Sequence, residues 1–202
     1  MLIGLTGGIA CGKSAATQLL AHHGCATLDT DQIAHQLLSK DEVKSALRTR
    51  WGDTVFNRQN EPDRPRIGQI VFADPAEKNW LETLLHPRIH QQWRDWARAR
   101  QGQVAIVEIP LLFEKNLENN FDLTVCVHCA QATQLARMAG RGLSAAQAAV
   151  RMGNQWPLEE KVRRAHICFF NEGTLSFLER QILLFLSRPS LARAIQNPSS
   201  AL

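Results

Sequence analysis

The segment from residue 7 to residue 14 has the residue types and spacing of a phosphate-binding loop. It reads Gly-Gly-Ile-Ala-Cys-Gly-Lys-Ser and matches G-x-x-x-x-G-K-[ST], whereas the dinucleotide pattern G-x-G-x-x-G does not occur there. Glycines let backbone N–H groups converge on an anion, and a helix beginning after the loop adds its positive end. Lys13 can reach the β- and γ-phosphates, and the Ser14 hydroxyl can bind Mg²⁺. The predicted nucleotide-binding residues are Gly8, Ile9, Ala10, Cys11, Gly12, Lys13, Ser14 and Ala15.

Two aspartates, Asp29 and Asp31, follow the next apolar run. An aspartate in such a place often caps a helix or a turn. At a strand end that faces a phosphate loop, however, a carboxylate can accept a proton from an attacking hydroxyl or hold a metal-bound water. We therefore predict catalysis by Asp31, and we take Ser14 and Asp29 as candidate metal ligands.

Arg137 and Arg141 are four residues apart, on one face of a predicted helix. Such a face is commonly a solvated surface. The alternative is a mobile lid whose arginines neutralise the charge on a transferred phosphoryl group. The surrounding segment, from residue 130 to residue 166, is rich in basic residues and so suits an anionic ligand.

Length, composition and charge narrow the class of protein. The 202 residues are 45% hydrophobic and 21% charged, with a net charge of +4, which is typical of a globular domain. No apolar run approaches the roughly 20 residues that cross a bilayer, and the first residues do not resemble a signal peptide. No basic run interleaves with aromatic residues, so nucleic acid is not expected as a partner. We expect a cytoplasmic protein.

The five cysteines favour reduced thiols, because their number is odd and no signal peptide is evident. Cys126 and Cys129 have the C-x-x-C spacing of some zinc sites. Their run reads as a strand, in which positions three apart point to opposite faces. We therefore expect buried strand cysteines rather than a metal site.

Apolar runs alternate with helical patterns, which predicts an α/β fold with a mostly parallel sheet flanked by helices. Ligands of such sheets bind at the carboxyl ends of the strands. The phosphate loop, the two aspartates and Glu108 all follow strands. The predicted strands are 2–6, 25–28, 104–108, 123–128 and 166–170.

Helices are predicted between these strands, and residues 41–101 show no strand pattern. Within that stretch Trp51 ends one helix, Pro75 begins another and Pro87 begins a third. Pro189 is expected to end the last helix, leaving a frayed tail. The other predicted helices are 14–23, 32–39, 130–141, 144–155 and 174–187.

Further motifs accompany the phosphate loop along nearly the whole chain. They are Asp29-Thr30-Asp31 with Ile33-Ala34-His35, Ile67-Gly68, Leu85-His86-Pro87, Pro110-Leu111-Leu112-Phe113-Glu114, Gln134 with Arg137 and Arg141, Arg151-Met152 with Gln155, and Asn171-Glu172-Gly173. In this order and spacing the sequence resembles the dephospho-CoA kinase family. It departs from that pattern at Cys11, where Ser is usual, at Ala15, where Thr is usual, and at His166, where Asp is frequent.

The resemblance implies an enzyme that transfers the γ-phosphoryl group of ATP, with Mg²⁺, to the ribose 3′-hydroxyl of dephospho-CoA. It implies that Asp31 is the base, that Arg137 and Arg141 belong to a lid, and that Asn171 and Gly173 lie near the adenine. The implied core is 1–31, 102–129 and 165–188, with a helical substrate region at 32–101, a lid at 130–164 and a tail at 189–202.

The residues alone leave two other functions open. One is a different small-molecule nucleoside or nucleotide kinase, and the other is a non-catalytic nucleotide switch that uses the same loop. The N-K-x-D element expected of a GTPase switch is not present in the sequence. The long helical stretch and the arginine pair also suit an enzyme with two substrates better than a switch.

Overall fold

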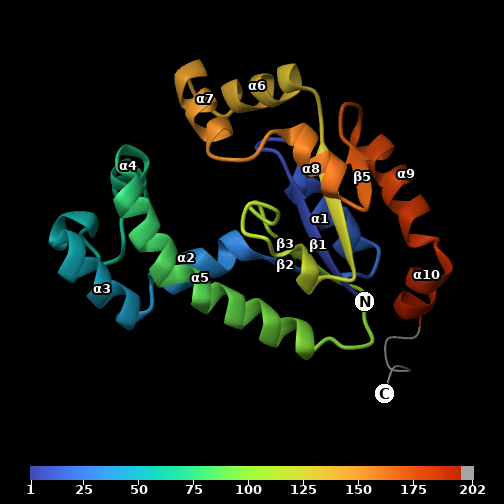
Figure 1. The fold of residues 1–202 in the computed structure, drawn as a ribbon, viewed down its shortest axis with the longest axis horizontal. Coiled ribbons are helices and arrows are strands. Elements are labelled where there is room, and N and C mark those ends of the chain that lie inside the picture. Colours follow the sequence, from blue (N-terminus) through green and yellow to red (C-terminus); the bar gives the residue numbers. More distant parts are fainter. Residues whose placement is uncertain (197–202) are drawn as a thin grey trace. The chain divides into compact units, whose positions relative to one another are not determined.

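The computed structural model describes residues 1–196, and Figure 1 shows the path of the chain. Within these residues a parallel five-stranded sheet has the order β2-β3-β1-β4-β5, as the alternating pattern predicted. The strands are β1 (Leu2–Gly7), β2 (Ala26–Asp29), β3 (Ala105–Glu108), β4 (Leu123–His128) and β5 (Ile167–Phe170).

The chain divides into two compact units. The first comprises Met1–Asp29 and the chain from Ala97 onward, and the second comprises Thr30–Trp96. The helices of the first unit are α1 (Lys13–His22), α6 (Gln131–Ala139), α7 (Ala145–Gly153), α8 (Leu158–Arg164), α9 (Leu175–Leu186) and α10 (Pro189–Gln196), with a 3-10 turn, η2 (Glu118–Asn120).

The core of the first unit forms around β1, which lies between β3 and β4. Ile3 and Leu5 of β1 are fully buried, as apolar residues of a central parallel strand should be. Helix α1 packs on α9, and α8 packs on β1 and β4. These contacts hold the carboxyl end of β1 and the start of α1, between which the phosphate loop runs.

The second unit is helical, as the missing strand pattern predicted. Its elements are α2 (Thr30–Leu38), α3 (Asp41–Trp51), the 3-10 turn η1 (Asp53–Val55), α4 (Arg64–Ala73) and most of α5 (Pro75–Arg98). Apolar side chains from all four helices are buried, among them Ile33, Leu47, Ile67 and Trp93. The Asp63 side chain caps α4 by accepting from the Arg66 N–H.

Two expectations for the helices are wrong, and one helix was missed. Pro87 does not begin a helix but lies inside the continuous 24-residue α5. Pro189 begins α10 rather than only ending α9, and Leu191 of α10 is fully buried, so this part of the expected tail is packed. Helix α8 was not predicted. The rest of the expected tail, residues 197–202, lies outside the described residues.

Within residues 1–196, no helix is both long enough and apolar enough to cross a membrane.

Candidate active site around the phosphate loop

The phosphate loop (residues 7–14) joins β1 to α1 in the conformation that its sequence requires. Gly12 is the residue before α1 and has a left-handed backbone, with φ 92°. A Cβ there would also overlap the Asn171 amide, so both conformation and space select glycine. Ala10 adopts φ 57°, which is unusual for a residue with a Cβ. The loop thus leads directly into the N-terminus of the ten-residue helix α1, and this arrangement is suited to binding phosphate.

Lys13 and Ser14 open α1. The Lys13 ammonium donates to the carbonyl oxygens of Gly7 and Gly8, at 3.3 and 3.2 Å. Its positive charge therefore lies along the loop, where the motif places phosphate. Ser14 is exposed in the first turn of α1, so its hydroxyl is accessible to a ligand.

Three side chains from distant segments hold the next three carbonyl groups of the loop. Gln134 Nε2 donates to the Ile9 oxygen at 2.7 Å, Arg137 to the Ala10 oxygen at 3.2 Å, and Asn171 Nδ2 to the Cys11 oxygen at 2.9 Å. Arg137 and Asn171 were predicted site residues. Gln134 was not, although it lies one helical turn before Arg137 on α6.

The two predicted lid arginines differ in their surroundings. Arg137 is half-buried and donates to the Ala10 and Asn171 carbonyl oxygens, so it lies against the phosphate loop. Arg141 lies beyond the end of α6 at Ala139, so the expectation that both arginines share one face of a helix is wrong. Its backbone N–H donates to the Met138 carbonyl oxygen, and its side chain is exposed and has no hydrogen bond or ion pair with the described residues.

The segment after β5 carries Asn171, Glu172 and Gly173. Asn171 is only 7% exposed because its amide lies on the phosphate loop, whereas Gly173 is exposed. The Glu172 carboxylate accepts from the Ala130 N–H and from the Thr133 hydroxyl, at the N-terminus of α6. These two hydrogen bonds lower the pKa of Glu172, with the Thr133 hydroxyl as the larger cause.

Two carboxylates end neighbouring strands of the first unit. Asp29 is the last residue of β2 and lies in register with Glu108, the last residue of β3. Glu108 is buried and accepts at 2.7 Å from the hydroxyl of Thr17 on α1. A serine hydroxyl with carboxylates, phosphate oxygens and water is a donor set that suits Mg²⁺. The residues present therefore fit this ion, and Glu108 joins the candidates that sequence reasoning named.

Asp31 belongs to the second unit. It is exposed in the first turn of α2, which begins at Thr30, two residues earlier than predicted. Its side chain is therefore accessible to a ligand, two positions along the chain from the end of β2.

The cysteines of the structure are free thiols, as their odd number predicted. Cys126 is buried in β4, and burial raises its pKa to about 12. Cys129 follows β4, and its sulfur lies 3.5 Å from that of Cys11 in the phosphate loop. Within residues 1–196, no group of three or more His, Cys, Asp or Glu side chains could hold a metal ion.

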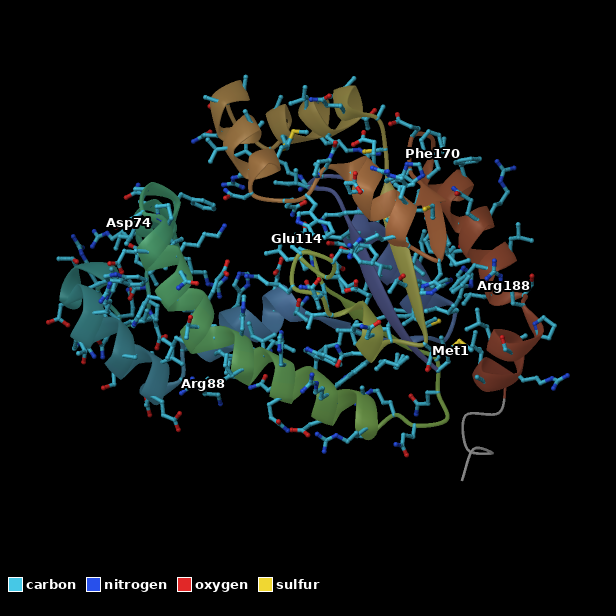
Figure 2. All side chains as sticks on the ribbon, viewed as in Figure 1. Met1, Asp74, Arg88, Glu114, Phe170 and Arg188 are labelled. Carbon is cyan, nitrogen blue, oxygen red and sulfur yellow. The ribbon has the colours of Figure 1, made fainter. Side chains whose placement is uncertain are left out.

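A buried ion pair that the sequence did not reveal lies beside this site. Lys161 of α8 is 0% exposed, and its ammonium lies 2.7 Å from Glu114 Oε1. Glu114 belongs to the loop between β3 and β4 and is labelled in Figure 2. The Lys161 ammonium also donates to the Pro110 carbonyl oxygen, which accepts from the Thr6 hydroxyl on β1. The pair is therefore connected to the strand that leads into the phosphate loop.

Comparison with known proteins gives a consistent result along the chain. A family model described as Dephospho-CoA kinase matches residues 1–176. A relative of that name from Synechococcus sp. (strain JA-3-3Ab) is 37% identical over 205 residues, covering 90% of this chain and 89% of the relative. Another, from Thermosynechococcus vestitus, is 41% identical over 184 residues, covering 89% and 90%.

A solved structure has a similar fold along the chain. The crystal structure of TT1252 from Thermus thermophilus superposes with a TM-score of 0.80 at 31% identity. The match covers 94% of this chain and 97% of that one, so the similarity includes both units.

Proposed function

Because the chain belongs to the dephospho-CoA kinase family, we propose that it transfers the γ-phosphoryl group of ATP to the 3′-hydroxyl of dephospho-CoA, giving coenzyme A and ADP. The family match over residues 1–176 carries this proposal. The phosphate loop supports it, since its glycines, lysine and serine are those that bind a nucleoside triphosphate.

The nucleotide phosphates lie in the phosphate loop and at the N-terminus of α1. Backbone N–H groups of residues 8–15 bind them, and the Lys13 ammonium follows the γ-phosphoryl oxygens as negative charge shifts during transfer. Asn171 and Gly173 lie toward the base of the nucleotide. Asn171 contributes by holding the loop, because its Nδ2 already donates to the Cys11 carbonyl oxygen.

The acceptor hydroxyl must lose its proton during transfer, and Asp31 is the base that takes it. Its exposure in the first turn of α2 supports this assignment. Phosphoryl transfer depends mainly on positioning and charge, so such a base supplies only part of the rate.

The Ser14 hydroxyl and the Asp29 carboxylate would hold Mg²⁺, with Glu108 beside Asp29 at the strand ends. When bound, the ion supplies positive charge to the β- and γ-phosphate oxygens.

The lid arginines supply further positive charge. Arg137 lies against the Ala10 and Asn171 carbonyl oxygens, which leaves other N–H groups of its guanidinium for phosphate. Arg141 has an exposed side chain with no protein partner within residues 1–196, so it can approach the transferred group when the lid segment moves.

The proposal is tested by measuring ADP release with ATP and Mg²⁺ in the presence of dephospho-CoA, AMP or uridine. We expect rapid release with dephospho-CoA, formation of coenzyme A in equal amount, and little release with the other acceptors. Preference for AMP or uridine would assign the protein to another small-molecule kinase activity. Binding of ATP with no transfer to any acceptor would favour a nucleotide switch.

A further inference from the structure

Five consecutive carbonyl groups of the phosphate loop, from Gly7 to Cys11, accept hydrogen bonds from side chains. Lys13 serves the first two. The other three are the Ile9, Ala10 and Cys11 carbonyls, and each is held by a different side chain. Those side chains are Gln134, Arg137 and Asn171. We call these three residues the carbonyl clamp.

We propose that the carbonyl clamp is a positioning device that sets the phosphate loop in its anion-binding conformation before the nucleotide arrives. The proposal deepens the function proposed above and rests on it. It assigns Gln134 a positioning role, and it adds a second role to Arg137 and Asn171 that does not depend on their touching the nucleotide.

The geometry of the peptide bond connects these carbonyls to the phosphate site. In a planar trans peptide the C=O of one residue and the N–H of the next point in opposite directions. Fixing the Ile9 and Cys11 oxygens toward the clamp therefore turns the N–H groups of Ala10 and Gly12 to the other side. Those N–H groups are then directed as an anion nest requires.

The loop needs such support because its backbone is locally unfavourable. Ala10 has φ 57°, in the left-handed region that residues with a Cβ avoid. Its carbonyl accepts from a charged donor, Arg137, and charged donors form stronger hydrogen bonds than neutral ones. Side chains outside the loop therefore stabilise a conformation that the loop's own sequence disfavours.

Two of the clamp residues, Gln134 and Asn171, are buried, and Arg137 is half-buried, which suits a positioning role. Gln134 is 4% exposed, and a Cβ on Gly8 would collide with its amide. The Ile9 oxygen can only accept, so this buried amide must present its N–H to the loop. Burial makes the hydrogen bond costly to lose, because an unpaired carbonyl would remain.

Further hydrogen bonds hold the elements that carry the clamp residues together. Arg137 donates to the Asn171 carbonyl oxygen, which joins α6 to the segment after β5. The adjacent residue, Glu172, binds the N-terminus of α6, the helix that carries Gln134 and Arg137. The clamp therefore ties α6, the segment after β5 and the phosphate loop into one unit.

The experiment measures ADP binding by calorimetry, without an acceptor substrate, for the wild type, Gln134→Leu, Gln134→Glu and Asn171→Ala. We expect ADP affinity to fall about tenfold in each variant, because one buried hydrogen bond is lost. Gln131→Leu is the matched control, since Gln131 is an exposed glutamine at the start of the same helix. It should bind ADP like the wild type.

A second measurement separates positioning from general stability. Hydrogen exchange of the nucleotide-free protein should be faster at the amides of residues 10–12 in the Gln134 and Asn171 variants. Exchange in β1 and β4 should not change. A merely structural role would lower the melting temperature and leave both ADP affinity and local exchange unaltered at lower temperature.

The outcomes are distinct. If folded Gln134→Leu and Asn171→Ala bind ADP as the wild type does, the clamp has no positioning role. If Gln134→Leu does not fold, Gln134→Glu and Asn171→Ala decide the matter by the same criterion. If the wild type itself does not bind ADP, the function proposed for the loop fails first. A wild type that binds ADP but does not phosphorylate dephospho-CoA leaves the inference intact and overturns only the acceptor.

Discussion

The Lys161 ammonium and Glu114 Oε1 form an ion pair of 2.7 Å in which the lysine side chain is fully buried. Burial lowers the pKa of Lys161, and the hydrogen bond that its ammonium donates to Glu114 opposes that change. Glu114 Oε1 also accepts from the Trp156 N–H at 2.9 Å, so the pair joins α8 and the preceding segment to the loop after β3. The second oxygen, Glu114 Oε2, is buried without a hydrogen bond within the described structure.

We expect Lys161→Met to lower the free energy of unfolding by about 3–5 kcal/mol, because Glu114 is left as a buried, uncompensated charge. The double variant Lys161→Met with Glu114→Gln should recover part of that loss. Arg163→Met, whose ion pair with Glu160 lies at the surface of the same helix, should cost about 1 kcal/mol or less. Urea unfolding checks the series, and equal costs for the two single variants would contradict it.

Lys13→Ala should reduce kcat about a thousandfold, a loss of about 4 kcal/mol, because the charge that follows the γ-phosphoryl group is removed. The fold should be retained, since among the described residues the Lys13 ammonium donates only to the Gly7 and Gly8 carbonyl oxygens of its own loop. Steady-state kinetics with a circular dichroism spectrum checks both points. Near-normal turnover would contradict the role of the phosphate loop.

Arg141→Ala should lower kcat more than it raises the KM for dephospho-CoA. The reason is that the contact between the Arg141 guanidinium and the transferred phosphoryl group strengthens as negative charge moves in the transition state. Arg137→Ala should also weaken ATP binding, since Arg137 holds the Ala10 carbonyl. Arg58→Ala, an exposed arginine of the second unit, serves as the control. Wild-type kinetics for Arg141→Ala would mean that the Arg141 side chain only contributes to the solvated surface.

Asp31→Asn should reduce coenzyme A formation at least about a hundredfold while ATP still binds, because asparagine keeps the shape but not the basicity. Asp41→Asn is a matched control, since Asp41 lies in the first turn of α3 as Asp31 does in α2. If Asp31 only caps its helix, asparagine should replace it with full activity. A loss of ATP affinity confined to Mg²⁺-containing buffer would instead place Asp31 near the metal.

The Glu172 carboxylate makes the attachment of α6 dependent on pH. Its pKa in the folded protein is lowered, so its contribution to stability is present above the ordinary glutamate pKa of about 4.3 and is lost as pH falls below it. Glu172→Gln should therefore be less stable than the wild type at pH 6, and the difference should narrow toward pH 3.5. Thermal melts across this range check the prediction, and parallel curves would argue against it.

The parts of the structure that the sequence predicted well are those whose signals are local. Buried parallel strands are short apolar runs, and β4 was predicted with its observed bounds, Leu123–His128. The phosphate loop is also local, because its glycines, lysine and serine lie within eight residues. The end of α3 at Trp51 and the start of α5 at Pro75 also follow from local signals, and both were predicted correctly.

The errors arise where tertiary packing outweighs a local signal. Pro87 removes a backbone hydrogen bond from α5, a cost of about 3 kcal/mol in a helix interior. Buried Leu85 and Trp93 hold the helix on either side of it, so the helix continues. Similarly, the short amphipathic segment after Pro189 is helical because Leu191 packs into the core of the first unit.

The unpredicted site residues act across long distances in the sequence. Gln134 lies 125 residues from its partner Ile9, and Lys161 lies 47 residues from Glu114. Nothing in a run of neighbouring residues signals such contacts. Glu108 was noted at its strand end, but only the structure shows that it accepts from Thr17 and lies in register with Asp29.

The central position of β1 determines when the sheet can form during translation. In the β1–β3 pair Leu2 lies opposite Ala105, and in the β1–β4 pair Ile3 lies opposite Leu123. Strand β1 leaves the ribosome before β3 and therefore waits roughly 5–20 s for its first partner, at about 5–20 residues per second. The helical unit of residues 30–96 can form meanwhile, whereas Ile3 and Leu5 remain without their sheet. Nascent chains arrested before residue 105 should consequently bind chaperones that recognise apolar strands, and chains arrested beyond β5 should release them.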